Sequence, residues 1–233
     1  MESIAQALEK VKRRIDDALT AAGRPAGTVQ MLAVSKTQSA ERVQAAIEAG
    51  QRAFGENYVQ EALDKMAALA ALRGQLQWHL IGPLQSNKTR AVAEAFDWVH
   101  SVDRLKIAQR LAEQRPPHLP PLMLCLQVNV SGEASKGGVA PNDALALAQA
   151  VAALPRERVW LRGLMSIPEP IADPGAQRLP HRSLCALLAA MNASGLGLDT
   201  LSMGMSADLE AAVAEGSTMV RVGTALFGQR GAP

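Results

Sequence analysis

Short apolar segments alternate along this chain with longer, Ala-rich segments of helical period. Eight of the apolar segments have the composition of strands, and each is followed by polar or glycine residues and then by a helical pattern. They are 29–34, 51–54, 77–81, 96–100, 122–130, 159–165, 200–203 and 219–222. Because parallel neighbours need crossover connections, this alternation predicts parallel strands joined by helices. Eight repeats favour an α/β fold, a single-domain (β/α)8 TIM barrel over residues 1–233, with an open doubly wound sheet as the alternative.

The segment at about residues 2–22 precedes the first strand and has charged residues between regularly spaced apolar ones. Ser3 and Gln6 have the spacing of a capping box. The apolar positions that would share one helix face are Ile4, Leu8, Val11, Ile15 and Leu19. We therefore predict an amphipathic helix packed on the barrel. Its charges exclude the apolar core of a signal peptide, and no apolar run reaches the ~18 residues of a membrane span, so we expect a cytoplasmic protein.

Composition argues against several classes of partner. Lys and Arg number 24 against 22 Asp and Glu, and the net charge of +2 gives little field to attract nucleic acid or an anionic membrane. Aromatic residues are 3% of the chain, which is too few for the stacking surfaces that bind single strands. Cys125 and Cys185 have no metal-binding or redox spacing, so we expect packing roles, a reducing compartment and no metal site.

Polar and glycine residues follow the predicted strands. In a (β/α)8 barrel the carboxyl ends of all strands meet at one face, where the active sites of such enzymes lie. We therefore expect one cleft to gather these residues. They are Lys36, Asn57, Gly82, His100, Asn129, Ser166, 202–206, Arg221, Gly223 and Thr224.

Lys36 ends the first strand, in "MLAVSKTQ", where a lysine is unexpected. On local sequence alone, a solvated lysine is the common explanation. Inside a barrel mouth, however, partial desolvation would lower the lysine pKa and yield the neutral amine that forms a Schiff base with an aldehyde. Such an aldehyde would carry its own phosphate.

The last two strand ends suggest where that phosphate binds, because barrels often hold phosphate after strands seven and eight. Gly204 and Gly223 allow backbone to approach an anion, and Ser206 and Thr224 offer hydroxyls. A helix beginning near Ser206 would direct free N–H groups at the anion. The alternative is that Ser206 only caps this helix and Gly223 only turns the chain.

Five motifs together resemble the pyridoxal phosphate homeostasis protein family, small single-domain relatives of the alanine racemase barrel. They are "MLAVSKTQ", "FGENYVQE", "WHLIGPLQSNK", "LRGLMSIP" and "LSMGMSADLEAAVAEGSTMVRVGTALFG". The resemblance implies pyridoxal 5′-phosphate (PLP) bound covalently to Lys36 as a Schiff base. It also implies cofactor contacts by further residues: Asn57 and Met203 near the ring, Arg221 at the ring nitrogen, and Ser206, Gly223 and Thr224 at the phosphate.

The role implied by the resemblance is intracellular PLP homeostasis, meaning that the protein holds, buffers or delivers the cofactor. Expected partners are PLP, other B6 vitamers and PLP-dependent apoenzymes, and the expected state is a monomer. Segment 171–184 departs from the family pattern in its Pro and Gly content, and we assign no site residue there.

Catalytic turnover is expected to be small or absent. Arg221 can only donate hydrogen bonds, so the ring nitrogen it meets would stay unprotonated and would stabilise a carbanion poorly. Alternatively, Arg221 is a rim residue paired with Glu56. Racemases of the larger relatives use a tyrosine from a second domain, whereas only 11 residues follow the last strand here. The possible acid/base groups are Tyr58, His79, His100 and Lys136. The enzyme alternatives are a racemase or decarboxylase acting through Lys36, and a class I aldolase.

Overall fold

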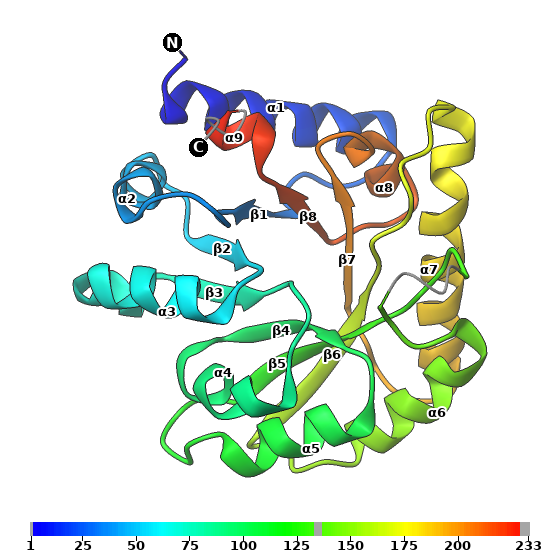
Figure 1. Ribbon diagram of the computed structural model, residues 1–233. Helices are drawn as coiled ribbons and strands as arrows, with labels where there is room; N and C mark the ends of the chain where they lie inside the picture. Colours follow the sequence, from blue (N-terminus) through cyan, green and yellow to red (C-terminus); the bar gives the residue numbers. More distant parts are fainter. Residues whose placement is uncertain (1, 133–136, 229–233) are drawn as a thin grey trace.

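The computed structural model describes residues 2–132 and 137–228. Within these ranges, eight parallel strands form a closed barrel in chain order, and β8 pairs with β1 to close it (Figure 1). The strands are β1 (Gln30–Val34), β2 (Ala53–Glu56), β3 (Gln77–Leu80), β4 (Trp98–Val102), β5 (Leu122–Gln127), β6 (Val159–Met165), β7 (Thr200–Met205) and β8 (Met219–Val222). The predicted barrel is therefore confirmed, and the open sheet is excluded.

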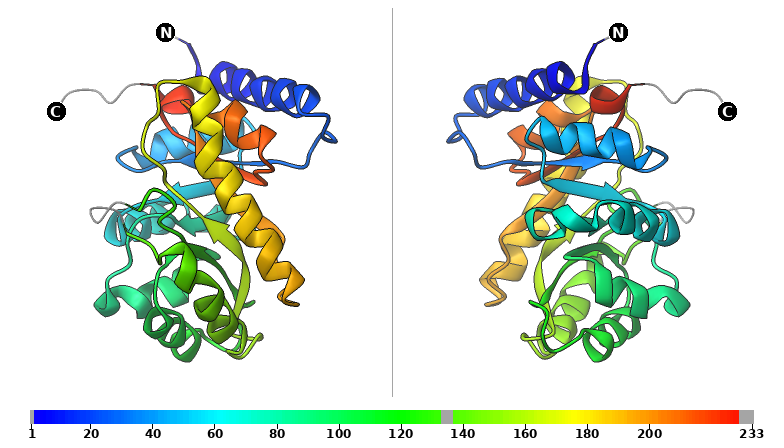
Figure 2. Two further views of the ribbon diagram at one scale, coloured as in Figure 1. Left: turned by 90° about the vertical axis from the view of Figure 1, so that its right-hand side faces the viewer. Right: turned by 90° about the vertical axis from the view of Figure 1, so that its left-hand side faces the viewer.

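Helices connect successive strands and surround the barrel (Figures 1 and 2). They are α1 (Ile4–Ala21), α2 (Ala40–Glu48), α3 (Val59–Ala68), α4 (Thr89–Ala95), α5 (Leu105–Gln114), α6 (Pro141–Ala152), α7 (Pro174–Ala193), α8 (Leu209–Ala214) and α9 (Thr224–Phe227). Two short 3-10 helices, η1 (Ala70–Gln75) and η2 (Ser86–Lys88), flank β3. Over 2–132 and 137–228, no helix has the length and apolarity that crossing a membrane requires.

The N-terminal helix α1 confirms the expected amphipathic pattern, and its bounds lie within the predicted 2–22. Ser3 Oγ accepts from Gln6 N at 3.2 Å, and Gln6 Oε1 accepts from Ser3 N at 2.9 Å, which completes the capping box. The apolar face is buried against α8, α9 and α2. Figure 1 shows α1 lying across α9, so the first and last described helices are packed together.

Two strands lie further along the chain than their apolar runs predict. Strand β2 starts at Ala53 rather than at Gln51, because the backbone N–H of Gln51 donates to Ala46 O of α2 at 2.9 Å instead of joining the ladder. At its other end, β2 continues through Gly55 and Glu56. Strand β4 likewise occupies 98–102 rather than 96–100. The apolar runs located the strands, and a backbone hydrogen bond to α2 sets where β2 begins.

The apolar core has two parts, one on each face of the sheet. A large cluster lies between the strands and the helices, and it includes residues such as Leu8, Phe54 and Leu111. Smaller clusters inside the barrel contain only residues of the strands and their ends, around Leu32 and Trp98. Because successive strand residues point to opposite faces, each strand contributes to both. Polar side chains fill the rest of the barrel interior.

Gly163 is required by the close contact of β6 with β7. A Cβ at this position would lie 1.8 Å from Thr200 O, and neither backbone can move aside without breaking the barrel ladder. We expect Gly163→Ala to lower the free energy of unfolding by about 3 kcal/mol or more, as strained core substitutions do. Urea denaturation measures this. In the control Gly74→Ala the new methyl group meets nothing within 4 Å, and equal stability of the two variants would contradict the argument.

Candidate functional site

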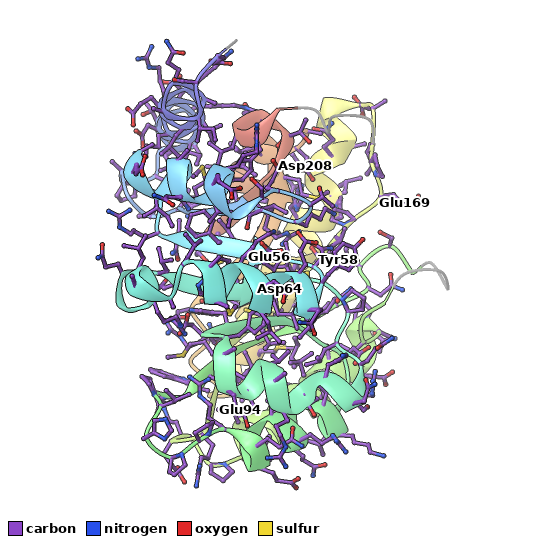
Figure 3. The ribbon with its side chains drawn as sticks, turned by 60° about the vertical axis from the view of Figure 1, so that its left-hand side comes forward. Glu56, Tyr58, Asp64, Glu94, Glu169 and Asp208 are labelled. Carbon is purple, nitrogen blue, oxygen red and sulfur yellow. The ribbon has the colours of Figure 1, made fainter. Side chains whose placement is uncertain are left out.

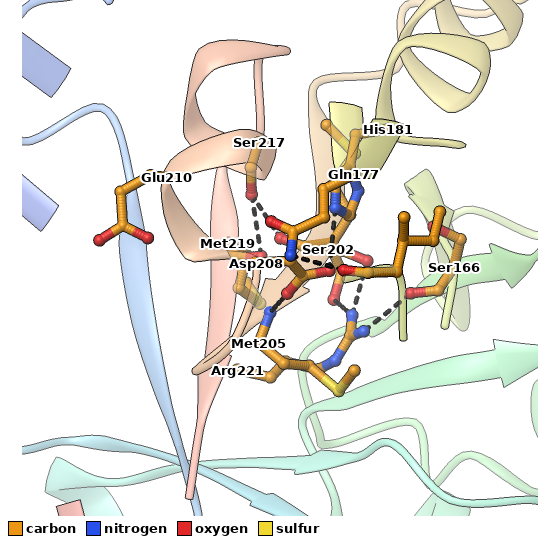
Figure 4. Close-up of polar contacts among 12 residues, drawn as sticks. Ser166, Gln177, His181, Ser202, Met205, Asp208, Glu210, Ser217, Met219 and Arg221 are labelled. Atoms are coloured by element: carbon orange, nitrogen blue, oxygen red, sulfur yellow. Dashed lines mark hydrogen bonds and ion pairs between the residues drawn. The ribbon is translucent and has the colours of Figure 1, made fainter. Parts of the chain in front are cut away.

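Arg221 on β8 lies inside the barrel, 4% exposed, and is held by Ser202 of β7 and by Ser166, which follows β6 (Figure 4). Its Nη1 donates to Ser202 O at 2.6 Å and to Ser202 Oγ at 2.9 Å, and its Nη2 donates to Ser166 O at 2.7 Å. Burial lowers the pKa of Arg221 to about 10. The alternative pairing with Glu56 is wrong, because Glu56 points out of the barrel and bonds to Lys65.

A chain of hydrogen bonds continues from Arg221 into the barrel interior. His100 Nδ1 lies 2.8 Å from Ser202 Oγ, and His79 Nδ1 lies 3.0 Å from His100 Nε2. Since Ser202 Oγ already accepts from Arg221, we assign its proton to His100 Nδ1, and then His100 Nε2–H donates to His79 Nδ1. Each group donates to the next, so the chain fixes one tautomer of each ring.

The two histidines of this hydrogen-bonded series, His79 and His100, are fully buried and neutral. Burial lowers the pKa of His79 to about 3, and the His79 ring stacks on Trp98 at 5.4 Å between centroids. Burial, followed by the proximity of His79 and of the Arg221 charge, holds the pKa of His100 well below its usual range. Their burial makes them poor acid/base groups for a ligand at the mouth, so the structure does not support that role for either ring.

Lys36 follows β1 and is half-buried. The extended pairing continues to Ser35, whose N–H donates to Gly55 O at 3.0 Å. Leu32 and Val34 belong to the cluster inside the barrel, and the alternation of side chains places Lys36 on that same inner face. The next residue, Thr37, has a left-handed φ of 63°. This position fits a lysine directed at the barrel mouth better than a solvated strand end.

Two strand-end side chains carry buried polar atoms that are available to a ligand. Asn57 Oδ1 and Ser166 Oγ are buried, and neither has a hydrogen-bond partner within the described ranges. Gly82 fixes the position of Asn57, because a Cβ there would lie 2.3 Å from Asn57 O. Buried polar atoms are normally satisfied. Asn57 Oδ1 and Ser166 Oγ therefore fit a polar small molecule bound in the mouth.

The expected anion site lies in the loops that follow β7 and β8. Met205 pairs with Arg221, and Ala33 pairs with Val222, so β7, β8 and β1 are adjacent. This register brings Ser206, Gly223 and Thr224 to the same end of three neighbouring strands as Lys36. A Cβ on Gly223 would meet Val34 Cβ and Val34 O at 3.4 Å, which shows how closely the two strand ends approach.

The helix after β7 begins later than expected. Helix α8 starts at Leu209, and Asp208 rather than Ser206 occupies the N-cap position. Asp208 is engaged on both oxygens, since Oδ1 accepts from Met205 N at 2.6 Å and Oδ2 lies 3.0 Å from His181 Nε2. Burial tends to raise the pKa of Asp208, but hydrogen bonds from His181 and Met205 N outweigh this effect, so the pKa lies below its ordinary value. Ser206 is thus left in the loop, where its hydroxyl does not cap the helix.

Gly204 is required where β7 leaves the barrel. Its φ of 92° is in the left-handed region, and a Cβ there would lie 2.4 Å from Ala212 Cβ on α8. Met203 lies on the other face of the strand, fully buried in the large outer cluster with the helices. The structure therefore does not bring the Met203 side chain to the barrel mouth with the other expected site residues.

Sequence reasoning missed several residues that shape the mouth. Segment 171–184 received no site residue, yet α7 begins at Pro174 and its buried His181 holds Asp208. The pair Asp173–Pro174 is a helix-start signal that could have located this helix.

The other two possible acid/base groups are Tyr58 and Lys136. The Tyr58 side chain is 57% exposed (Figure 3), and Lys136 lies outside the described residues.

The buried His79 should make stability depend on pH. An unfolded histidine titrates near 6.5, whereas the pKa of His79 in the folded chain is about 3. Between these values the unfolded chain binds a proton that the folded chain does not, so the free energy of unfolding falls as pH is lowered. In His79→Phe, which keeps a ring against Trp98, we expect a pH slope shallower by up to about 1.4 kcal/mol per unit. Urea unfolding at pH 7 and pH 5 measures this, and equal slopes would contradict it.

Comparisons with known proteins agree with this geometry. Residues 7–231 match the family model described as alanine racemase, N-terminal domain. The chain is 63% identical to a pyridoxal phosphate homeostasis protein of Pseudomonas aeruginosa, covering 100% of this chain and 99% of the relative, and 51% identical to that of Escherichia coli K12, covering 99% and 98%. PipY of Synechococcus elongatus, solved with PLP bound, is 40% identical with a TM-score of 0.79, over 92% of this chain and 100% of PipY. The chain therefore belongs to the alanine racemase N-terminal domain family and, within it, to the pyridoxal phosphate homeostasis proteins.

Proposed function

We propose that this protein binds PLP at the carboxyl end of the barrel, as a Schiff base on Lys36, and holds, buffers or delivers it in the cell. The observation that carries the proposal is the adjacency of β7, β8 and β1. It brings the Lys36 amine, Arg221 and the two loops after β7 and β8, which suit a phosphate, to one end of the barrel. The names of the relatives and the PLP-bound structure of PipY support it.

The residues present fit PLP chemically. The aldehyde would take the Lys36 amine, and the phosphate would take the Ser206 and Thr224 hydroxyls with the backbone at Gly223. Arg221 would face the ring nitrogen. The orphaned Asn57 Oδ1 would lie beside the ring and gain a partner.

Arg221 also bears on turnover. Bound PLP supplies an electron sink when its ring nitrogen is protonated, as it is beside a carboxylate. The Arg221 guanidinium remains a donor at neutral pH, because even its lowered pKa is about 10. A ring nitrogen that accepts from it stays unprotonated, so we propose a carrier with little or no turnover rather than a racemase or decarboxylase.

The remaining parts of the proposal concern setting and partners. We propose a cytoplasmic monomer whose further partners are other B6 vitamers and PLP-dependent apoenzymes. The balanced charge of +2 and the capped, charged helix α1 support this setting. Size-exclusion chromatography with light scattering tests the oligomeric state.

Replacement of Lys36 tests the covalent linkage. We expect Lys36→Ala to lose the absorbance of the bound cofactor while its circular dichroism stays unchanged, because the amine is removed from a strand end that packing does not need. Borohydride reduction followed by peptide mass analysis should place the PLP adduct on Lys36 in the unaltered protein. Colour retained by the variant after desalting would move the attachment elsewhere.

Incubation with amino acids separates a carrier from an enzyme. We expect no racemisation or decarboxylation of D- or L-amino acids at rates near the usual enzymatic ~10 s⁻¹. Chiral chromatography of the products measures both. Steady turnover in that range by the PLP-loaded protein would reject the carrier role. An unchanged deuterium content at Cα after incubation in heavy water would support it.

A further inference from the structure

A buried charged cluster lies outside the barrel, between α3 and the ends of β1 and β2. It consists of Glu56, Glu61 and Lys65, and we call it the Lys65 cluster (Figure 3 labels Glu56 against α3). The Lys65 Nζ lies 2.8 Å from Glu56 Oε1 and 2.6 Å from Glu61 Oε1. The Lys65 and Glu56 side chains are 6% and 0% exposed, so this pair is cut off from water. The cofactor site proposed above uses none of the three.

The cluster is fully engaged around the ammonium group. Lys65 Nζ donates its third hydrogen bond to Ser35 O at 2.5 Å, so all three of its N–H bonds have acceptors. Ser35 Oγ also donates to Glu56 Oε1, at 2.6 Å. Burial raises the pKa of Glu56, although hydrogen bonds from Lys65 and Ser35 oppose this. Buried ion pairs add little stability over apolar residues of similar size, so another reason for this cluster is needed.

The contacts of the cluster with the main chain fall on the two residues that flank Lys36. On one side, Lys65 Nζ bonds to the carbonyl of Ser35. On the other side, the Thr37 N–H donates to Glu61 Oε1 at 2.5 Å. The same carboxylate oxygen accepts from Lys65, so Glu61 joins the two sides. The backbone at Lys36 is therefore held at both ends by one connected set of charges.

The conformation held there is strained. Thr37 has a φ of 63°, and the left-handed region costs a residue with a Cβ about 1–2 kcal/mol, more for a β-branched one. Such a conformation persists only where surrounding contacts enforce it, and it is found most often at functional sites. Two contacts hold it: the bond from Thr37 N–H to Glu61, and the bond from Gln38 N–H to Ser35 O at 3.0 Å, which closes a turn around Thr37. Loss of the bond to Glu61 would make negative φ easier to reach at Thr37, and that change would rotate the peptide that carries Lys36.

We propose that the Lys65 cluster is a positioning device that clamps Ser35 and Thr37 and thereby holds Lys36 toward the barrel mouth. Glu61, Glu56 and Lys65 are positioning residues, since none touches the expected cofactor. The proposal rests on the proposed function only in its consequence for PLP. The clamp itself is a property of the chain without cofactor and can be measured there.

Glu61→Ala is the primary test, because Glu61 is the most exposed member of the cluster, at 29%, and its loss leaves the buried Lys65–Glu56 pair intact. We expect faster hydrogen exchange at the Thr37 amide in the cofactor-free protein and about a tenfold weaker PLP dissociation constant, in line with the cost of the left-handed conformation. Glu61→Gln keeps an oxygen acceptor and should restore most of both. Circular dichroism confirms that each variant is folded.

Thr37→Gly provides the decisive comparison. Glycine adopts positive φ without strain, so the clamp has less to enforce. In a double-mutant cycle, Glu61→Ala should weaken PLP binding much less in the Thr37→Gly background than alone. Glu9→Ala, which removes an exposed ion pair with Lys12 on α1, is the matched charge control and should change neither readout.

The outcomes separate the two proposals. Unchanged exchange at Thr37 in Glu61→Ala, or an additive cycle, would overturn the clamp even if PLP binds to Lys36. Faster exchange at Thr37 together with an unaltered protein that forms no adduct at Lys36 would support the clamp and reject the proposed function. For the clamp, Lys65→Met should reproduce the Glu61→Ala exchange result, and a folded Lys65→Met with wild-type exchange would also overturn it.

Discussion

The pairing of β8 with β1 is the constraint on which the site depends. Lys36 and Thr224 are separated by almost the whole chain, and only barrel closure makes their strands neighbours. Because all strands are parallel, closure also places both residues at the same end. The short strand β8 pairs along both of its edges, with β7 on one side and with β1 on the other. An open sheet with the eight strands in this same chain order would leave the amine and the anion loops at opposite edges.

The barrel interior is used in two ways. Apolar clusters around Leu32 and Trp98 fill part of it, and a hydrogen-bonded chain from Arg221 through Ser202 to the two histidines fills the rest. Carbonyls and a hydroxyl satisfy the buried guanidinium, and within 2–132 and 137–228 no carboxylate forms an ion pair with it, although the charge of Asp208 opposes the lowering of its pKa. This keeps Arg221 a strong donor in a place where a carboxylate partner would have weakened its field. Arg221 thus places a positive charge beneath the mouth.

The strands and the main site residues could be predicted from the sequence, whereas the contacts between distant residues could not. Short apolar runs located all eight strands, and β8 has the predicted bounds, because a strand buried on both faces reads as one continuous apolar segment. Strand ends gave Lys36 and Arg221. Contacts between distant residues could not be predicted from the sequence. Lys65 stands four residues after Glu61, which is the spacing of an ordinary exposed ion pair on a helix. Only the fold shows that Glu56 completes a buried cluster with them. Met203 was placed near the ring by the family resemblance alone, whereas its side chain is buried in the outer cluster with the helices.

Helix α1 has a consequence beyond packing. Arg14 pairs with Glu210 on α8 and donates from Nη1 to Ser206 O at 2.8 Å, so the first helix holds the loop that we assign to the phosphate. The amino-terminal segment is therefore an outer wall of the anion loop, although it contributes no strand to the barrel. Displacement of this helix would remove the Arg14 contacts from the loop at Ser206, together with the apolar packing of α1 on α8.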